Sequence, residues 1–96
     1  MKVTVAAMQM AATDDHGANL DQAEAIIRDA AAAGANIVLP SELFSTPMFM
    51  FGDWKAEHFA RAEALDGVTV SRMQSIAREL GIVVPTNIFE LSLIHI

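Results

Sequence analysis

The 96-residue sequence contains no cysteine. A disulfide framework, a thiolate metal site and a cysteine nucleophile are therefore excluded within these residues. The three histidines, His16, His58 and His95, lie far apart and lack metal-ligand spacing, so they are predicted to be surface residues. The five glycines are isolated, which leaves no phosphate-binding loop.

Basic residues are also scarce, because six Lys and Arg stand against twelve Asp and Glu, for a formal net charge of −6. The six are scattered singly, so the sequence offers no electrostatic footprint for nucleic acid. The amino-terminal apolar stretch is too short and too interrupted to span a membrane, and it lacks the shape of a secretory signal. A cytoplasmic protein without nucleic-acid or membrane partners is the simplest prediction.

The hydrophobic fraction of 53% with many alanines predicts a packed, helix-bearing globule of one domain. Residues 2–10 and 37–43 are predicted to be inner strands buried on both faces, because both sides of each are largely apolar. Between them, apolar residues at helical spacing predict a helix over 20–33. Asn19 is its expected N-cap and Gly34 its stop. Strand, helix and strand form one βαβ unit.

The second half of the chain repeats this alternation. Thr69 is a plausible cap for a second helix, which Gly81 ends. Residues 82–89 then read as a third strand, in which Pro85 predicts an edge, a bulge or an early end. The fold class is therefore α/β, with a βαβ unit, a second helical crossover and a third strand.

The stretch LFSTPMFMFGDW, residues 43–54, is dense in aromatic residues and methionine, yet Pro47 and Gly52 interrupt any regular helix. Three interpretations stay open: ordinary packing on the body, the wall of a pocket, or a contact with a partner chain.

A single carboxylate, Glu42, follows where the apolar run of IVLPSEL stops. In open α/β sheets, ligand crevices form at the carboxyl ends of the strands, so Glu42 is a candidate for chemistry. From position alone, a solvated loop carboxylate is the simpler explanation.

Several segments together resemble a known family. VTVAAMQM, NLDQAEAIIRDAAAAGANIVLP, SELFSTPMF and GIVVPTNIFE are similar, in order and spacing, to the amino-terminal part of the nitrilase or carbon–nitrogen hydrolase superfamily. ELFSTPMF and EHFARAEALDG are closest to its N-carbamoylputrescine amidase branch. Residues 1–90 are thus interpreted as the incomplete amino-terminal part of a hydrolase domain. Residues 91–96, LSLIHI, do not match and are interpreted as a truncated edge strand or a foreign tail.

The resemblance implies a partial nitrilase-type α/β sandwich, which is a four-layer αββα arrangement in the full-length family dimer. It also implies a Glu, Lys, Cys triad in which Glu42 is the general base and the Lys and Cys lie on later strands. Lys2 and Lys55 are not in the matching context. The implied reaction converts N-carbamoylputrescine to putrescine, carbon dioxide and ammonia, a step of polyamine biosynthesis, in a homo-oligomer without a cofactor. These 96 residues alone are expected to be inactive.

Alternatives remain at this point. Met48 stands where the amidase branch has tyrosine, which leaves other small ureides or amides open: a β-ureido acid as for β-ureidopropionase, an ω-amide as for ω-amidase, or a nitrile. Asp53 and Glu57 are candidates for an acidic lining that would select a cationic amine tail, although exposed acids are common. A different class of function is a complete small α/β binding module without catalysis.

Overall fold

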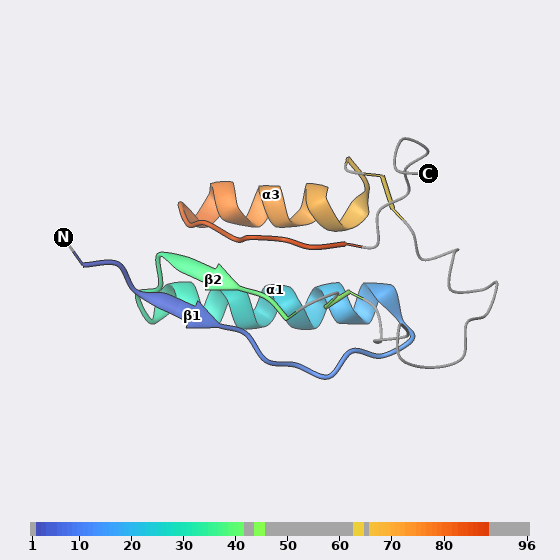
Figure 1. Cartoon of the computed structure of the whole chain (residues 1–96), viewed down its shortest axis with the longest axis horizontal. Coiled ribbons are helices and arrows are strands. Elements are labelled where there is room, and N and C mark those ends of the chain that lie inside the picture. Colours follow the sequence, from blue (N-terminus) through green and yellow to red (C-terminus); the bar gives the residue numbers. More distant parts are fainter. Residues whose placement is uncertain (1, 42–43, 46–62, 65, 89–96) are drawn as a thin grey trace.

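The computed structural model describes residues 2–41, 44–45, 63–64 and 66–88 (Figure 1). The elements are β1 (Val5–Ala7), α1 (His16–Ala32), β2 (Ile37–Leu39) and α3 (Val68–Leu80). β1 and β2 pair in parallel, with Val5 opposite Ile37 and Ala7 opposite Leu39. Parallel neighbours need a crossover connection, and α1 provides it. The α/β class predicted from the sequence is confirmed.

The predicted third strand lies beside β2, but it is much shorter than expected. The backbone N–H of Val83 donates to the carbonyl of Asn36, and the N–H of Val38 donates to the carbonyl of Val83, both at 2.9 Å. These two bonds form a single parallel bridge between Val83 and Ile37. Within the described residues, the segment 82–88 therefore adds one rung to the sheet and no continuous strand.

Two prolines explain why this ladder stops. In a parallel ladder, the rung after Val83 would join the N–H of residue 85 to the carbonyl of Val38, and the N–H of residue 40 to the carbonyl of residue 85. Both donors are missing, because positions 85 and 40 are Pro85 and Pro40. The early end predicted from Pro85 is confirmed, and Pro40 on the facing strand removes the second bond of the same rung.

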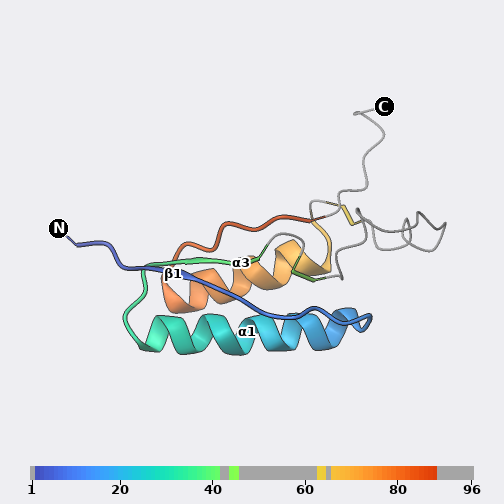
Figure 2. The same cartoon turned by 60° about the horizontal axis from the view of Figure 1, so that its bottom comes forward.

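Both helices lie on one side of the strands, as Figure 2 shows. Side chains alternate along β1 and the residues after it, so that Ala6 and Met8 point into the core while Val5 and Ala7 are exposed. The core is formed by buried apolar side chains from both helices and from the strands and their flanking residues: Met8, Leu20, Ala23, Ile27, Ala35, Val38, Phe44, Met73 and Ile76. Neither helix is both long and apolar enough to cross a membrane, within the part of the chain that the structure describes.

The first helix begins earlier than predicted. Asp15 is its N-cap, and the Asp15 carboxylate accepts a hydrogen bond of 3.0 Å from the N–H of Ala18. Asn19, the predicted cap, lies inside the helix with 0% of its surface exposed. The predicted stop is confirmed, because Gly34 adopts a φ of 104°, which is strained for other residues.

The second described helix, α3, starts after Gly67, which makes no side-chain cap. Thr69, the predicted cap, lies in the first turn instead, and its N–H donates to Glu63 Oε1 at 2.9 Å. The carboxylate of Glu63 thus does what the sequence assigned to the Thr69 hydroxyl, because it accepts a bond from a free N–H of the first turn. Gly81 ends the helix in the left-handed conformation, as predicted.

The face of the sheet away from the helices is apolar and open. Val3, Val5, Leu39 and Val83 are 56%, 61%, 48% and 58% exposed, respectively. The prediction that both strands are buried on both faces is therefore wrong for this chain. The physical reason is that the helices cover one face, and no described residue forms a layer over the other.

We predict that a polypeptide of these 96 residues, purified alone, associates through this open face, because exposed apolar strands favour burial against one another. The double variant Val5→Lys, Val83→Lys should have a sedimentation coefficient closer to that of a monomer than the unsubstituted polypeptide has. Val68→Lys is the matched control, since Val68 is also exposed, at 65%, but lies at the start of α3. Equal association of the sheet-face variant and the control would contradict the prediction.

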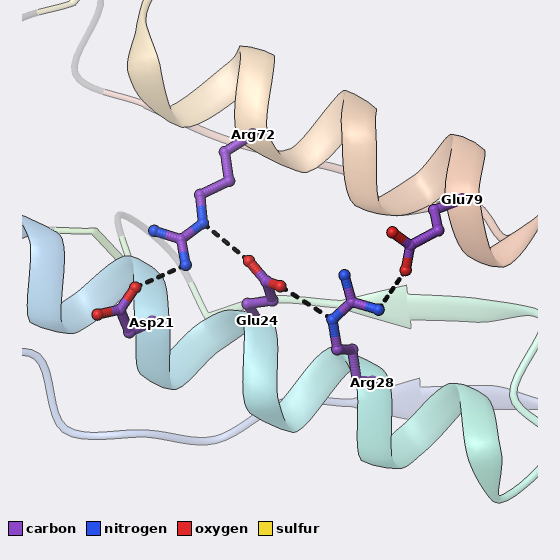
Figure 3. Close-up of polar contacts among 5 residues, drawn as sticks. All are labelled: Asp21, Glu24, Arg28, Arg72 and Glu79. Carbon is purple, nitrogen blue, oxygen red and sulfur yellow. Dashed lines mark hydrogen bonds and ion pairs between the residues drawn. The ribbon is translucent and has the colours of Figure 1, made fainter.

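A network of ion pairs joins the outer surfaces of α1 and α3 (Figure 3). Arg72 on α3 reaches Asp21 at 2.6 Å and Glu24 at 2.9 Å. Glu24 also pairs with Arg28 at 2.9 Å, and Arg28 in turn contacts Glu79 on α3. Glu24 therefore pairs with one arginine from each helix and is the centre of this network of ion pairs.

These contacts change the titration of the carboxylates. Hydrogen bonds from Arg28 and then Arg72 lower the pKa of Glu24 below its ordinary value of 4.5. The hydrogen bond from Arg28 likewise lowers the pKa of Glu79. A carboxylate with a lowered pKa in the folded state stabilises that state above its unfolded pKa, and the stabilisation is lost as the pH falls through the folded pKa.

Glu24→Gln should therefore lower the free energy of unfolding at neutral pH by about 1 kcal/mol, a value suited to partly exposed pairs. The difference from the unsubstituted chain should shrink as the pH falls through the lowered pKa of folded Glu24, because its carboxylate then becomes protonated as well. Urea unfolding at pH 7 and at a series of lower pH values, in the background with the two sheet-face lysines, measures this change. Asp29→Asn on the same helix is the control, since the Asp29 side chain has no ion pair among the described residues. A difference for Glu24→Gln that stays the same down to the lowest pH at which the chain is folded would refute the assignment.

Candidate functional site

The carboxyl ends of the parallel strands meet at one edge of the sheet, which is where α/β sheets bind ligands. At this edge β2 continues into Pro40 and Ser41, and the residue that follows is Glu42. Glu42, predicted to be catalytic, lies outside the described residues, as does Leu43; Phe44 and Ser45 are described again. The surroundings of the candidate carboxylate are therefore built from the residues on either side of it in the chain.

Ser41 is held on two sides. Its hydroxyl donates to the carbonyl of Met8, just past the end of β1, at 3.0 Å. Its own carbonyl accepts a long hydrogen bond of 3.5 Å from the side-chain amide of Asn87, beyond Pro85. These side-chain bonds join the three chain segments at the level where the prolines prevent backbone pairing.

Ser45 is held by a different element. The side-chain amide of Asn19, on α1, donates to the carbonyl of Ser45 at 2.8 Å, and this contact is buried. Ser45 itself is 2% exposed, and the neighbouring Phe44 is part of the core. The segment that resumes after Leu43 is thus packed on the body, which agrees with the first of the three interpretations of residues 43–54 at Phe44 and Ser45. The rest of that stretch lies outside the described residues.

The Asn19 amide uses its full hydrogen-bonding capacity. Its NH₂ group donates to the carbonyls of Thr13 and Ser45, at 2.7 and 2.8 Å. Its oxygen accepts from the N–H and the hydroxyl of Thr13, at 2.7 and 3.1 Å. Two donors and two acceptor positions are all that an asparagine side chain offers. A buried amide that is fully satisfied in this way fixes the relative positions of the groups that it joins.

A second polar cluster lies at the start of α3. The hydroxyl of Thr69, which is fully buried, donates to Glu63 Oε2 at 2.6 Å. His16 Nε2 lies 3.0 Å from the Thr69 oxygen and 3.6 Å from Glu63 Oε2. The His16 side chain is 39% exposed, which agrees with the prediction of a surface residue, and it also contacts the carboxylate of Glu63, 47 positions away in the sequence. His58 and His95 lie outside the described residues.

This cluster does not amount to a metal site. It holds one histidine and one carboxylate, and no group of three potential metal ligands exists elsewhere among the residues with described positions. The contacts that are present satisfy the Thr69 hydroxyl and the first turn of α3, so the cluster supports the helix.

Comparison with known proteins identifies the family. The family model for carbon–nitrogen hydrolases matches residues 4–92. The chain belongs to the carbon–nitrogen hydrolase family. The resemblance noted in the sequence is confirmed, and so is the partial α/β arrangement expected for that family.

Individual members of the family are similar to the chain over nearly its whole length. It is 47% identical to N-carbamoylputrescine amidase of Solanum lycopersicum over 89 residues, which cover 92% of the chain and 29% of that relative. The amidases of Oryza sativa subsp. japonica and Arabidopsis thaliana are 44% and 40% identical over 90 residues, with 93% of the chain and 30% of each relative covered. The chain thus spans less than a third of the length of the curated relatives that it matches.

The other residues considered for the site can now be placed. Asp53, Glu57 and Lys55 lie outside the described residues, so the proposed acidic lining remains a prediction. Lys2 is exposed and precedes β1, so it lies at the amino-terminal ends of the strands and not at the carboxyl ends, where the candidate site is.

The sequence predicted Asn19 as a helix cap and did not reveal that its side chain joins Thr13 and Ser45. The signal that could have corrected this was local: Asp15 is an equally good cap residue and lies four positions earlier. With Asp15 as the cap, Asn19 falls on the same helical face as Ala23 and Ile27, which points into the core.

Proposed function

We propose that this chain is the part of an N-carbamoylputrescine amidase that carries the general base, Glu42. Two observations support the proposal. The curated relatives that match 92–93% of the chain carry that name. The second is positional: Glu42 follows directly after the carboxyl end of β2, the edge where α/β sheets hold their ligands. The position of Glu42 alone would be weaker support than the two observations together, because one fold class hosts many functions.

The proposed chemistry needs three groups. Glu42 accepts the proton of a cysteine thiol, which becomes a nucleophilic thiolate and attacks the ureido carbonyl carbon. A lysine stabilises the oxyanion of the tetrahedral intermediate. Collapse of this intermediate breaks the bond to the terminal nitrogen, which takes the proton held by Glu42 and leaves as ammonia. Water that gives a proton to Glu42 then hydrolyses the remaining thiocarbamate, which frees the cysteine, and the released carbamate separates into putrescine and carbon dioxide.

The lysine and the cysteine of this triad belong to later parts of the family sequence. The 96 residues contain no cysteine, and their two lysines, Lys2 and Lys55, are not in the matching context. We therefore expect no ureide hydrolysis by a polypeptide of these 96 residues. A place in polyamine biosynthesis and assembly as a homo-oligomer are further parts of the proposal, and they rest on the family resemblance. Cytoplasmic location is also part of the proposal.

The role of Glu42 can be tested in a completed chain, here defined as residues 1–90 followed by the part of the S. lycopersicum amidase that lies beyond the matched 89 residues. Glu42→Gln keeps the shape of the side chain but cannot accept a proton. We expect it to lower kcat for N-carbamoylputrescine by about 10²-fold or more, the usual contribution of a general base.

Glu24→Gln is the control for this substitution, because it also removes one carboxylate but from the outer surface between α1 and α3. It should leave kcat unchanged. Turnover by Glu42→Gln equal to that of the control would remove Glu42 from the mechanism.

The substrate is tested separately, with the same completed chain. We expect kcat/KM for N-carbamoylputrescine to exceed the values for a β-ureido acid, an ω-amide and a nitrile. A preference for one of these three would retain the family mechanism and reject the proposed substrate.

A further inference from the structure

We propose that Asn19 and Ser41 are positioning residues that hold the two ends of the segment carrying the general base. This inference rests on the proposed role of Glu42, and it adds two residues that do not themselves react. Ser41 comes directly before Glu42 in the chain, and Ser45, which Asn19 holds, comes three residues after it.

The end before Glu42 lacks backbone hydrogen bonds toward the neighbouring segment 82–88, whereas on the β1 side the N–H of Met8 donates to the carbonyl of Leu39 at 2.8 Å. Pro40 cannot donate to the ladder, and Pro85 on the neighbouring segment cannot donate to it either. The Ser41 hydroxyl adds a further attachment on the β1 side through its 3.0 Å bond to the carbonyl of Met8. Ser41 comes directly before Glu42 in the chain, so this bond holds the residue to which the proposed general base is joined.

The end after Glu42 is fixed from the opposite direction. Asn19 donates to the Ser45 carbonyl from the first turn of α1, and its other three bonds tie it to Thr13, so the amide cannot rotate freely. The Phe44 ring, buried in the core, anchors the same end. One end of the segment is therefore attached to the β1 side of the sheet and the other to the helix layer.

Removal of Asn19 would leave the buried carbonyl of Ser45 without its partner. The simplest way to satisfy that carbonyl is for residues 44–45 to move toward water, and such a movement displaces the segment attached to them. Displacement of a catalytic group by about 1 Å can lower the rate by up to about 10²-fold. Binding of the substrate should change much less, because a proton acceptor acts mainly in the transition state.

The experiment uses the completed chain with Asn19→Ala and, separately, Ser41→Ala. We expect kcat per folded molecule to fall by about tenfold to a hundredfold for Asn19→Ala and by a smaller factor for Ser41→Ala, with KM nearly unchanged in both. The acid limb of the pH profile of kcat should also shift, because a displaced carboxylate has different neighbours.

Thr69→Val is the matched control, because Thr69 is also a polar residue with 0% exposure, but it supports the start of α3. The control should lower stability without moving the pH profile. If Asn19→Ala gives no folded protein, Ser41→Ala decides alone, since Ser41 is only partly buried.

The inference is overturned if the kcat and the pH profile of the folded variants match those of Thr69→Val. That outcome is distinct from failure of the proposed function, which shows as unchanged turnover in Glu42→Gln. A loss of activity in Glu42→Gln together with normal kinetics in Asn19→Ala and Ser41→Ala would reject the positioning role only.

Discussion

The extent of the sheet at the carboxyl ends of its strands depends on two missing N–H groups, those of Pro40 and Pro85, which would have formed the rung after the bridge between Val83 and Ile37. The backbone hydrogen bonds between β2 and the segment 82–88 end at the Val83 bridge among the described residues, and side-chain hydrogen bonds connect the chain segments beyond it. Ser41, Asn87 and Asn19 each supply one such bond, from the loop after β2, the segment after Pro85 and α1. Interruption of regular structure next to a functional residue is common in proteins, since it frees side chains to define the site.

The same fold leaves one face of the sheet unused. Both helices cover the face that carries Val38 and Met8, and the ion pairs around Glu24 join the helices on the outside. The opposite face presents exposed valines and Leu39. The chain covers 29–30% of the length of its curated relatives, and the layered sandwich implied by the family resemblance would place a second sheet against such a face. The open face is what a single layer of that sandwich would present.

The sequence predicted those features that depend on local periodicity. The two helices, their order relative to the strands and the glycines at 34 and 81 follow from residue spacing and from the left-handed conformation that glycine tolerates. The predictions that Asn19 and Thr69 cap the helices were wrong, because nearby acids compete for the free N–H groups of the first turn. Asp15 accepts the hydrogen bond at the start of α1, and Glu63 accepts it at the start of α3. Hydrophobicity on both sides of the strands could not reveal which face this chain itself covers.

The candidate site was predictable in part. The place of Glu42 after an apolar strand was visible in the sequence, and its catalytic role is a proposal because the residue lies outside the described part. The support around it was not visible, since Asn19 and Ser45 are 26 positions apart and Ser41 and Met8 are 33 apart. Contacts over such separations exist only after the helix has packed on the sheet.

A crystal structure of the completed chain with an unreactive ureide analogue tests the central claim most directly. We expect the Glu42 carboxylate to be sheltered from solvent, within hydrogen-bonding reach of the cysteine thiol and beside the ureido carbonyl. A Glu42 side chain on the outer surface, turned toward bulk water and away from the analogue, would contradict it.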